Sequence, residues 1–403
     1  MINIKQAKTI DGKVMDLAVH SEQEMTIDAT GLMLFPGLID PHVHFRVPGL
    51  EHKEDWCTGA RAAIAGGYTT VFDMPNTIPP AVTAERLYQK KQRIDAELKS
   101  AGIPLRYELY FGTDHRHFSE IHQVKNDVIG IKIFMGESTG NLVLDDEGMH
   151  AAFAIAATQN LLVAVHAEDA TRIAERALQY KASTNYCDHS NIRDPEAAAL
   201  AVQKAIALAR WYGVRLYILH VSTSNELALI KEAKEEGLPV YAETTPHHLF
   251  LDETVYDVLH GRALVNPPLR GKHHQQALWQ AIFDGVIDTI GSDHAPHLPH
   301  EKEKPYGGCP CGMPGIETTL PLLLTAAREE RLSLEKILYL TYHRPREIFQ
   351  LPKNDDIVLV DMQTPRTVIG ASLKTKCAWS PFEGRVLTGW PKCVVVNGQY
   401  VSC

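Results

Sequence analysis

The chain alternates between short apolar runs and longer segments with helical periodicity. The apolar runs span residues 34–44, 69–76, 105–112, 129–136, 161–168, 215–222, 238–247 and 286–297. Helical patterns between them include residues 54–67, 83–102, 194–213 and 224–237. Several of these helices start at Asp, Ser or Thr and stop at Gly, which are ordinary capping signals. Eight strands alternating with helices predict a parallel sheet, and eight is the number that closes a (β/α)8 TIM-type barrel.

The two ends of the chain have a different pattern. Short β-type segments occur at residues 14–19 and 24–31, and again at 356–362, 384–390 and 392–401. Neither end is long enough for a stable sheet of its own. We therefore expect a small β-sandwich domain built from both ends, residues 1–34 plus 350–403, beside an α/β barrel over residues 35–349. A doubly wound open sheet is the structural rival, but it would not need polar residues at the ends of so many strands.

Composition narrows the class of protein. The 403 residues are 45% hydrophobic and 22% charged, which is ordinary for a globular protein. A formal charge of −9 argues against nucleic-acid or anionic-membrane partners. No leader and no run of about 18 apolar residues is visible, so neither secretion nor a membrane span is expected. Seven scattered cysteines do not form a disulfide framework, which favours a cytoplasmic protein.

Polar side chains stand at the ends of several predicted strands. Side chains alternate along a strand, so His42 and His44 face the same way as Asp40. In a barrel, the carboxyl ends of the strands form the catalytic face. Separate strands therefore bring six polar side chains together at one end of the barrel: His42, His44, Lys132, His166, His220 and Asp293.

This set suits metal chemistry. Neutral imidazoles and a carboxylate match zinc or another borderline divalent ion. Lys132 fits only if its amine has reacted with carbon dioxide, because the resulting carbamate has two oxygens that can bridge metals ~3.5–4 Å apart. A lone histidine at a strand end is usually structural, and one His-x-His among 20 histidines is weak. The complete ordered set predicts a dinuclear site.

Other polar residues have plainer interpretations. Cys309 and Cys311 lie in a Gly/Pro-rich segment and are expected to be loop thiols. Asn76 lies in a turn on the active face and is a candidate for contacting substrate. His247 and His248 end another strand and could act on the site indirectly. Solvated or structural roles are expected for His115, His117, His122, His189, His260, His273, His274, His300 and His343.

The order of ligands along the chain resembles the amidohydrolase superfamily. Within it, "DPHVHFRVPGLEHKED", "AGGYTTVFDMPNT", "NPPLR", "SDHAPH" and "PGIETTLPLLL" resemble dihydroorotases, of the type that includes the dihydroorotase domain of the multifunctional animal pyrimidine enzyme. The resemblance covers essentially the whole chain. It implies reversible, zinc-dependent cyclisation of N-carbamoyl-L-aspartate to L-dihydroorotate in de novo pyrimidine (UMP) biosynthesis.

The resemblance also implies roles for individual residues. One zinc would be held by His42, His44, Lys132 and Asp293, and the other by His166, His220 and Lys132, with Lys132 carboxylated on its amine. Asp293 would be the general acid/base beside a metal-bridging hydroxide. The substrate α-carboxylate would be bound by Arg46, Asn76 and His297. Asn266 and the backbone around Gly312 would contact the ring, and Ser138 and Thr139 are weaker candidates in a loop.

The chain departs from the pattern of some family members at two positions. Many bacterial members have Asp as the bridging ligand where this chain has Lys132. Leu219 replaces a cysteine that the animal domain uses for an extra metal, so no third zinc is expected.

The runner-up function is another cyclic amidohydrolase, namely a hydantoinase, dihydropyrimidinase or allantoinase. An inactive homologue that serves as a scaffold for aspartate transcarbamoylase is a further alternative. A homodimer, and association with that transcarbamoylase, are family expectations.

Overall fold

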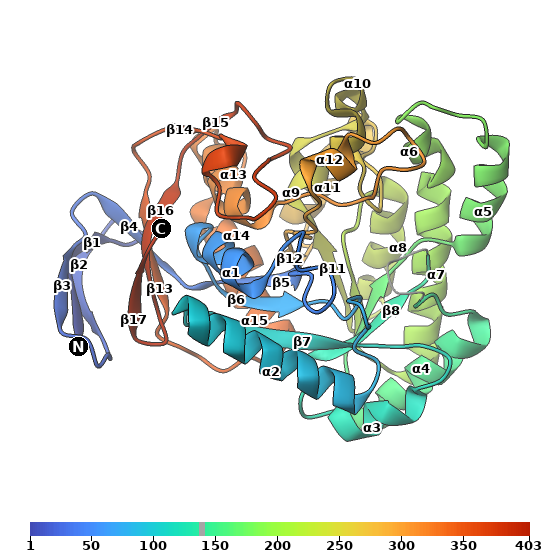
Figure 1. Ribbon diagram of the computed structural model, residues 1–403, viewed down its shortest axis with the longest axis horizontal. Helices are drawn as coiled ribbons and strands as arrows, with labels where there is room; N and C mark the ends of the chain where they lie inside the picture. Colours follow the sequence, from blue (N-terminus) through green and yellow to red (C-terminus); the bar gives the residue numbers. More distant parts are fainter. Residues whose placement is uncertain (137–141) are drawn as a thin grey trace.

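The eight predicted strands form one parallel sheet that curls into a barrel. The computed structural model describes residues 1–136 and 142–403. The sheet has the order β12-β11-β10-β9-β8-β7-β6-β5, with helices alternating around it (Figure 1). The predicted barrel is therefore confirmed. Its strands are β5 (Leu38–Val43), β6 (Tyr68–Asp73), β7 (Arg106–Gly112), β8 (Gly130–Phe134), β9 (Val163–His166), β10 (Leu216–Ile218), β11 (Val240–Thr244) and β12 (Thr289–Ile290).

The barrel closes through individual contacts rather than a full ladder between β5 and β12. Val43 forms a parallel bridge with His294, and the His44 amide donates to the His294 carbonyl at 2.9 Å. Below this bridge, the Ser292 amide donates to the Asp40 carboxylate at 3.0 Å. Burial raises the pKa of this Asp40 carboxyl to about 7. Closure therefore places the His-x-His segment directly beside the loop that follows β12.

Helices cover the outside of the barrel. Helices α1, α2, α7 and α8 begin at Asp55, Thr83, Asp194 and Thr223, whose side chains accept hydrogen bonds from the first turn. The helices are α1 (Trp56–Ala65), α2 (Ala84–Ala101), α3 (Ile121–Val124), α4 (Asp146–Gln159), α5 (Ala170–Gln179), α6 (Asp188–Ile192), α7 (Pro195–Tyr212), α8 (Ser224–Glu235), α9 (Pro246–Phe250), α10 (Tyr256–Leu259), α11 (Lys272–Phe283), α12 (Pro299–Lys302), α13 (Ile316–Arg328), α14 (Leu334–Leu338) and α15 (Arg344–Ile348). No described helix has the length and apolar character needed to cross a membrane.

Strands from both chain ends share a second sheet, as expected. Its order is β17-β16-β13-β4-β1-β2, with β3 also pairing with β1. The antiparallel β4–β13 pair joins the two ends, and the sheet lies beside the barrel (Figure 1). The strands are β1 (Ile2–Lys8), β2 (Val14–Val19), β3 (Met25–Asp28), β4 (Leu32–Pro36), β13 (Ile357–Asp361), β16 (Trp390–Val396) and β17 (Gln399–Ser402); β14 (Arg366–Thr367) and β15 (Val386–Leu387) pair separately.

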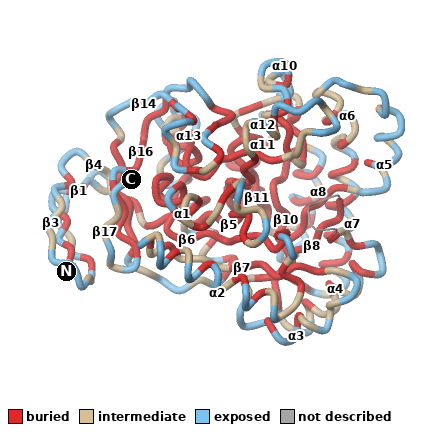
Figure 2. The backbone as a smooth tube through the Cα atoms, in the orientation of Figure 1, coloured by how far each residue is buried: buried red, intermediate tan, exposed pale blue. Residues whose placement is uncertain are grey.

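The barrel interior is filled with apolar side chains at one end and lined with polar side chains at the other. Every residue of β5, β6, β8 and β9 is buried, as expected for strands covered on both faces (Figure 2). Phe349 follows α15 and packs against Phe72, Tyr110 and Tyr217, with ring centroids 4.8, 6.3 and 5.0 Å away. This aromatic cluster fills one end of the barrel interior, and the cavity opens at the other end, where the strands have their carboxyl ends.

Candidate active site

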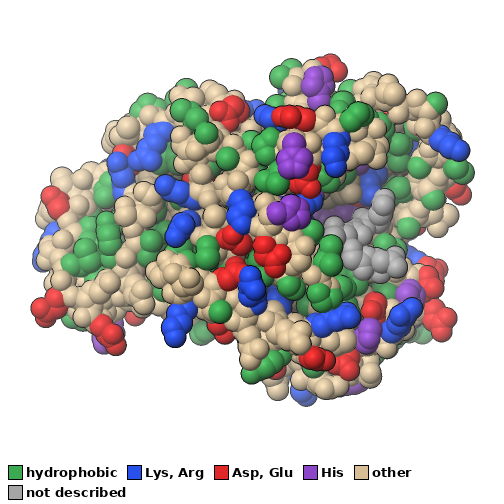
Figure 3. All heavy atoms as spheres, in the orientation of Figure 1, with side chains coloured by type: hydrophobic (Ala, Val, Ile, Leu, Met, Phe, Trp, Pro, Cys, Tyr) green, Lys and Arg blue, Asp and Glu red, His purple; other side chains and the backbone are tan. Residues whose placement is uncertain are grey.

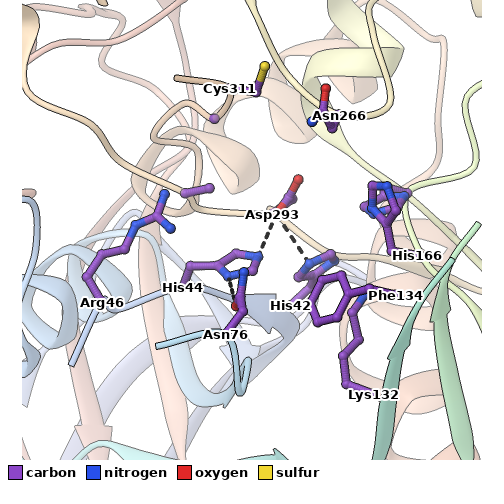
Figure 4. Close-up of a pocket in the computed structure, with 13 residues that line it drawn as sticks. His42, His44, Arg46, Asn76, Lys132, Phe134, His166, Asn266, Asp293 and Cys311 are labelled. Carbon is purple, nitrogen blue, oxygen red and sulfur yellow. Dashed lines mark hydrogen bonds and ion pairs between the residues drawn. The ribbon is translucent and has the colours of Figure 1, made fainter. Parts of the chain in front are cut away.

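A cavity opens at the carboxyl ends of the barrel strands (Figure 4). Acidic and basic side chains are interspersed over the face of the molecule drawn in Figure 3. The cavity brings together all six predicted metal-site residues and four of the predicted substrate residues. It is lined by His42, His44, Arg46, Asn76, Lys132, His166, His220, Asn266, Asp293 and Gly312, with Phe134, Ala295 and Cys311.

Two imidazole nitrogens and one carboxylate oxygen converge in this cavity. The Nε2 atoms of His42 and His44 each lie 3.2 Å from Oδ1 of Asp293. Both rings use Nδ1 elsewhere: His42 donates to Glu243 at 2.8 Å, and His44 donates to the Asn76 side-chain oxygen at 2.9 Å. In the neutral form of each ring, the lone pair on Nε2 therefore faces a carboxylate. Such an arrangement repels unless a cation lies between the groups, so this donor set fits a divalent metal.

A second pair of imidazoles lies on the neighbouring strands. Nδ1 of His166 is 2.9 Å from Nε2 of His220, while Nε2 of His166 is 2.9 Å from the Glu168 carboxylate. Since a carboxylate only accepts, His166 carries its proton on Nε2 and presents the Nδ1 lone pair toward His220. His220 lies just beyond β10 with φ 39°, a left-handed conformation that is rare outside glycine. Asp293 also has a positive φ, of 45°.

Lys132 stands between the two imidazole groups. It lies in the middle of β8 and is buried, with Nζ 4.6 Å from the centre of the Phe134 ring. Burial lowers the pKa of the Lys132 amine to about 7. A substantial fraction of this amine is therefore neutral near pH 7, which is the form that reacts with carbon dioxide.

Burial also controls the charge of the other residues in this group. It lowers the pKa of His44 to about 3 and lowers those of His166 and His220 as well, so these rings are neutral. Burial alone would raise the pKa of Asp293, but His42 and His44 outweigh it and hold that pKa well below its usual range. Burial would lower the pKa of His42, but the Asp293 and Glu243 carboxylates outweigh burial and raise it. The cavity therefore combines three neutral imidazoles with an ionised carboxylate, and His42 has to lose its proton for metal binding.

Arg46 forms one wall of the cavity. Its backbone has φ 66°, and its Nε atom donates to the Pro296 carbonyl at 3.2 Å. One guanidinium nitrogen lies 3.2 Å from Nε2 of His297, which stands just behind the lining residues. Burial lowers the pKa of Arg46 to about 10, so the side chain remains a cation at neutral pH. A buried cation and a histidine beside His44 and Asn76 provide donors for an anionic group.

The opposite wall carries Asn266 and the loop at Gly312. The Asn266 side-chain oxygen accepts from His189, 2.9 Å away, and the Gly312 amide donates to Leu264 at 2.9 Å. Gly312 has φ 132°, and a Cβ there would meet the Ala295 carbonyl oxygen at 2.5 Å, so a larger residue would close this wall. Cys311, interpreted as a plain loop thiol, in fact lines the cavity.

The remaining sequence candidates are distributed around the cavity. Cys309 lies outside it, with its thiol against the Gly261 carbonyl. His248 contacts the Pro267 carbonyl at 3.1 Å, next to Asn266, so it contacts the loop that forms the wall. The ring of His247 packs on His248, with centroids 4.5 Å apart. Ser138 and Thr139 lie outside the described residues.

Three buried residues that the sequence interpretation missed support the imidazoles. Glu243 on β11 accepts from His42 and also from the Tyr217 hydroxyl at 2.9 Å. Glu168 accepts from His166 and forms an ion pair with Arg193 at 2.5 Å. Burial would raise the pKa of Glu168, but Arg193 and His166 outweigh burial and lower it to about 2. The sequence signal for Glu243 is a charged residue inside an otherwise apolar strand, whereas Glu168 follows the end of β9 by two residues.

A buried ion pair fixes the backbone beneath the Arg46 wall. Lys90 on α2 lies 2.5 Å from the Asp73 carboxylate and donates to the Met74 carbonyl at 2.7 Å. The other oxygen of Asp73 accepts from the Phe45 amide at 2.8 Å. One ion pair therefore holds both the segment with His44 and Arg46 and the turn with Asn76.

Comparison with known proteins agrees with this geometry. A model of the amidohydrolase family matches residues 33–401, so the chain belongs to that family. Together with the group His42, His44 and Asp293, membership indicates a metal cofactor. The chain is an enzyme that hydrolyses cyclic amides.

Its sequence relatives are dihydroorotases. The chain is 36% identical to the dihydroorotase of Halobacterium salinarum, with 99% of this chain and 96% of that protein aligned. It is 38% identical to the dihydroorotase of Carboxydothermus hydrogenoformans over 92% of this chain and 87% of that protein. The multifunctional protein CAD of Squalus acanthias is 34% identical, over 91% of this chain and 15% of that longer protein. The expected resemblance to dihydroorotases is confirmed.

Solved structures with similar folds include hydantoinases and dihydropyrimidinases. The L-hydantoinase (dihydropyrimidinase) of Arthrobacter aurescens has a TM-score of 0.93 and 28% identity, covering 100% of this chain and 96% of that chain. Dihydropyrimidinase from Brevibacillus agri has a TM-score of 0.86 and 27% identity, covering 99% and 94%. The fold is therefore shared among enzymes with different cyclic amide substrates, and the substrate has to be inferred from the cavity.

Proposed function

We propose that this enzyme is a dihydroorotase, which interconverts N-carbamoyl-L-aspartate and L-dihydroorotate in pyrimidine biosynthesis. The observation that carries this proposal is the buried Arg46 guanidinium, in contact with His297 on the wall of the metal cluster. A cation inside a protein is costly unless an anion pairs with it. The ring carboxylate of dihydroorotate would supply that anion, whereas hydantoin, dihydrouracil and allantoin have no such group.

The residues that line the cavity would hold a pair of zinc ions. His42, His44 and Asp293 would hold one ion, His166 and His220 the other, and carboxylated Lys132 would bridge them. Bound divalent ions would lower the pKa of a water nucleophile and polarise the ring carbonyl. The neutral His44 and His166 rings and the buried, partly deprotonated Lys132 support this assignment.

The chain's own residues would perform the remaining steps. In the direction of hydrolysis, Asp293 accepts the proton of the attacking water and delivers it to the departing ring nitrogen. Arg46, Asn76 and His297 hold the carboxylate so that the ring carbonyl faces Asp293. Asn266 and the backbone near Gly312 contact the other side of the ring. For cyclisation the same groups act in reverse order, and water leaves.

Another cyclic amide substrate is the alternative supported by the structural neighbours. The test is to assay purified, metal-analysed protein with L-dihydroorotate and N-carbamoyl-L-aspartate, beside hydantoin, dihydrouracil and allantoin. Turnover of the first two compounds alone, with about two metals per chain, supports the proposal. Turnover of another cyclic amide would retain the metal site and refute the carboxylate assignment. No turnover by the metal-loaded protein would favour an inactive scaffold for aspartate transcarbamoylase.

A further inference from the structure

Lys53 connects the proposed carboxylate site to a carboxylate of the protein itself. Its Nζ lies 2.9 Å from Nδ1 of His297 and 2.9 Å from the Glu301 carboxylate. The side chains of Lys53 and Glu301 are only 12% and 14% exposed. Neither residue lines the cavity, so both act on it through His297.

These contacts determine which nitrogen of His297 carries the proton. The ammonium of Lys53 has donors and no acceptor, so Nδ1 of His297 has to accept. Nε2 of His297 lies 2.9 Å from the Cys311 carbonyl oxygen, which can only accept. The neutral ring therefore carries its proton on Nε2. Burial, followed by the charges of Arg46 and Lys53, holds the pKa of His297 well below its usual range, which keeps the ring neutral.

This tautomer changes the meaning of the contact with Arg46. A guanidinium nitrogen of Arg46 lies 3.2 Å from Nε2 of His297, and both atoms are donors. Two donors cannot satisfy each other, whereas a carboxylate oxygen between them could accept from both. The converging donors of Arg46 and His297 thus need the Nε2–H form of the ring.

The loop that carries Arg46 also supplies Lys53. The Leu50 amide donates to the Arg46 carbonyl at 3.0 Å, and the Lys53 amide donates to the Leu50 carbonyl at 2.9 Å. The chain therefore folds back on itself after the His-x-His-x-Arg segment. One short loop places a guanidinium on the substrate side of His297 and an ammonium on the other side.

We propose that Lys53 is a positioning residue of the carboxylate site: together with the Cys311 carbonyl it fixes His297 in the Nε2–H form, and this one proton is shared between that carbonyl and a substrate carboxylate oxygen that Arg46 also binds. This inference rests on the proposed function. Glu301 holds the Lys53 ammonium in place and balances its charge. Lys53 itself does not touch the substrate.

The test compares Lys53→Met, which removes the donor, with Lys53→Arg, which keeps a charged donor. In metal-loaded protein, Lys53→Met is expected to raise the KM for L-dihydroorotate about tenfold, which matches one lost hydrogen bond to a charged group, with little change in kcat or metal content. Lys53→Arg is expected to stay within about threefold of the parent KM. A parent-like KM in Lys53→Met would overturn the proposal.

A double-variant cycle separates this role from a general effect of charge. If Lys53 acts through His297, then Lys53→Met added to His297→Ala changes KM by less than about twofold. An undiminished tenfold effect in the His297→Ala background would show that Lys53 acts directly on the substrate or on the fold, and would overturn the proposal.

Nitrogen-15 NMR of imidazole-labelled protein gives a readout that does not depend on substrate. The His297 signals, identified by their loss in His297→Ala, are expected to report an Nε2–H ring in the parent and a mixture of tautomers in Lys53→Met. Unchanged signals would overturn the proposal. If the parent protein failed to turn over dihydroorotate, the proposed function would fall, while this NMR comparison would still test the link between Lys53 and His297.

Discussion

Nδ1 of His166 lies 2.9 Å from Nε2 of His220, although the two residues are 54 positions apart in the chain. Both rings are buried, and Glu168 fixes the proton of His166 on the far nitrogen. The pair therefore presents imidazole nitrogen to a common point from two adjacent strands. The orientation of His166 depends on Glu168, a residue that would not itself bind the metal.

Replacing Glu168 with Gln should weaken metal binding. The Gln side chain can accept from His166 but also carries an amide donor, and it has no charge to offset that of Arg193. Loss of such a carboxylate partner typically lowers metal affinity by about 10- to 100-fold. Competition with a zinc chelator measures this change. Glu317→Gln, at a buried carboxylate outside the cavity, is the control and should bind zinc like the parent protein.

Asp293→Asn should remove turnover while leaving part of the metal. The amide cannot accept the proton of the water nucleophile, and general acid–base catalysis is typically worth about 10²- to 10⁴-fold in rate. His42 and His44 would still supply two of the proposed ligands, so partial metal content is expected. Steady-state kinetics and metal analysis of the same sample measure both effects. Parent-like activity in Asp293→Asn would refute its role as the base.

Arg46→Lys should chiefly weaken substrate binding. Lysine keeps the charge but cannot make a bidentate contact, and it would lose the bond from Nε to the Pro296 carbonyl. We expect the KM for L-dihydroorotate to rise about 10- to 100-fold, with a smaller change in kcat. If kcat instead fell about 10- to 100-fold and KM stayed unchanged, Arg46 would act in the chemical step.

Reactivation of metal-free protein should depend on pH and carbon dioxide through Lys132. Its pKa is lowered to about 7 by burial, so the ammonium form dominates below that pH and the reactive amine above it. At fixed dissolved carbon dioxide, zinc should therefore restore activity faster at pH 8 than at pH 6. Lys132→Glu supplies a carboxylate without this reaction, so any activity it regains should not depend on carbon dioxide. An identical dependence in both proteins would refute the carbamate.

Lys90→Met should destabilise the protein. The substitution leaves the Asp73 carboxylate buried without its cation, and breaking such a pair typically costs about 3–5 kcal/mol. Urea unfolding followed by circular dichroism measures the loss. Adding Asp73→Asn should recover part of it, because a neutral amide costs less to bury. A double variant no more stable than Lys90→Met would contradict this account.

The sequence by itself determined the barrel and most of the cavity. Strands covered on both faces have to be apolar throughout, so a polar residue at the end of such a run, like His166 or His220, stands out. The shared direction of the strands then brings these ends to one face. That argument needs only the order of residues within each strand.

Tertiary structure alone decided which partners meet these residues. Glu243 reaches His42 from a strand 201 positions away, and Lys53 meets His297 across 244 positions. Such contacts leave no periodic signal, because they depend on barrel curvature and on where each loop returns. The local pattern of apolar and polar residues in the sequence reflects burial and backbone geometry. Which histidine nitrogen carries a proton, and which charges pair, depends on atoms that come together only when the barrel closes.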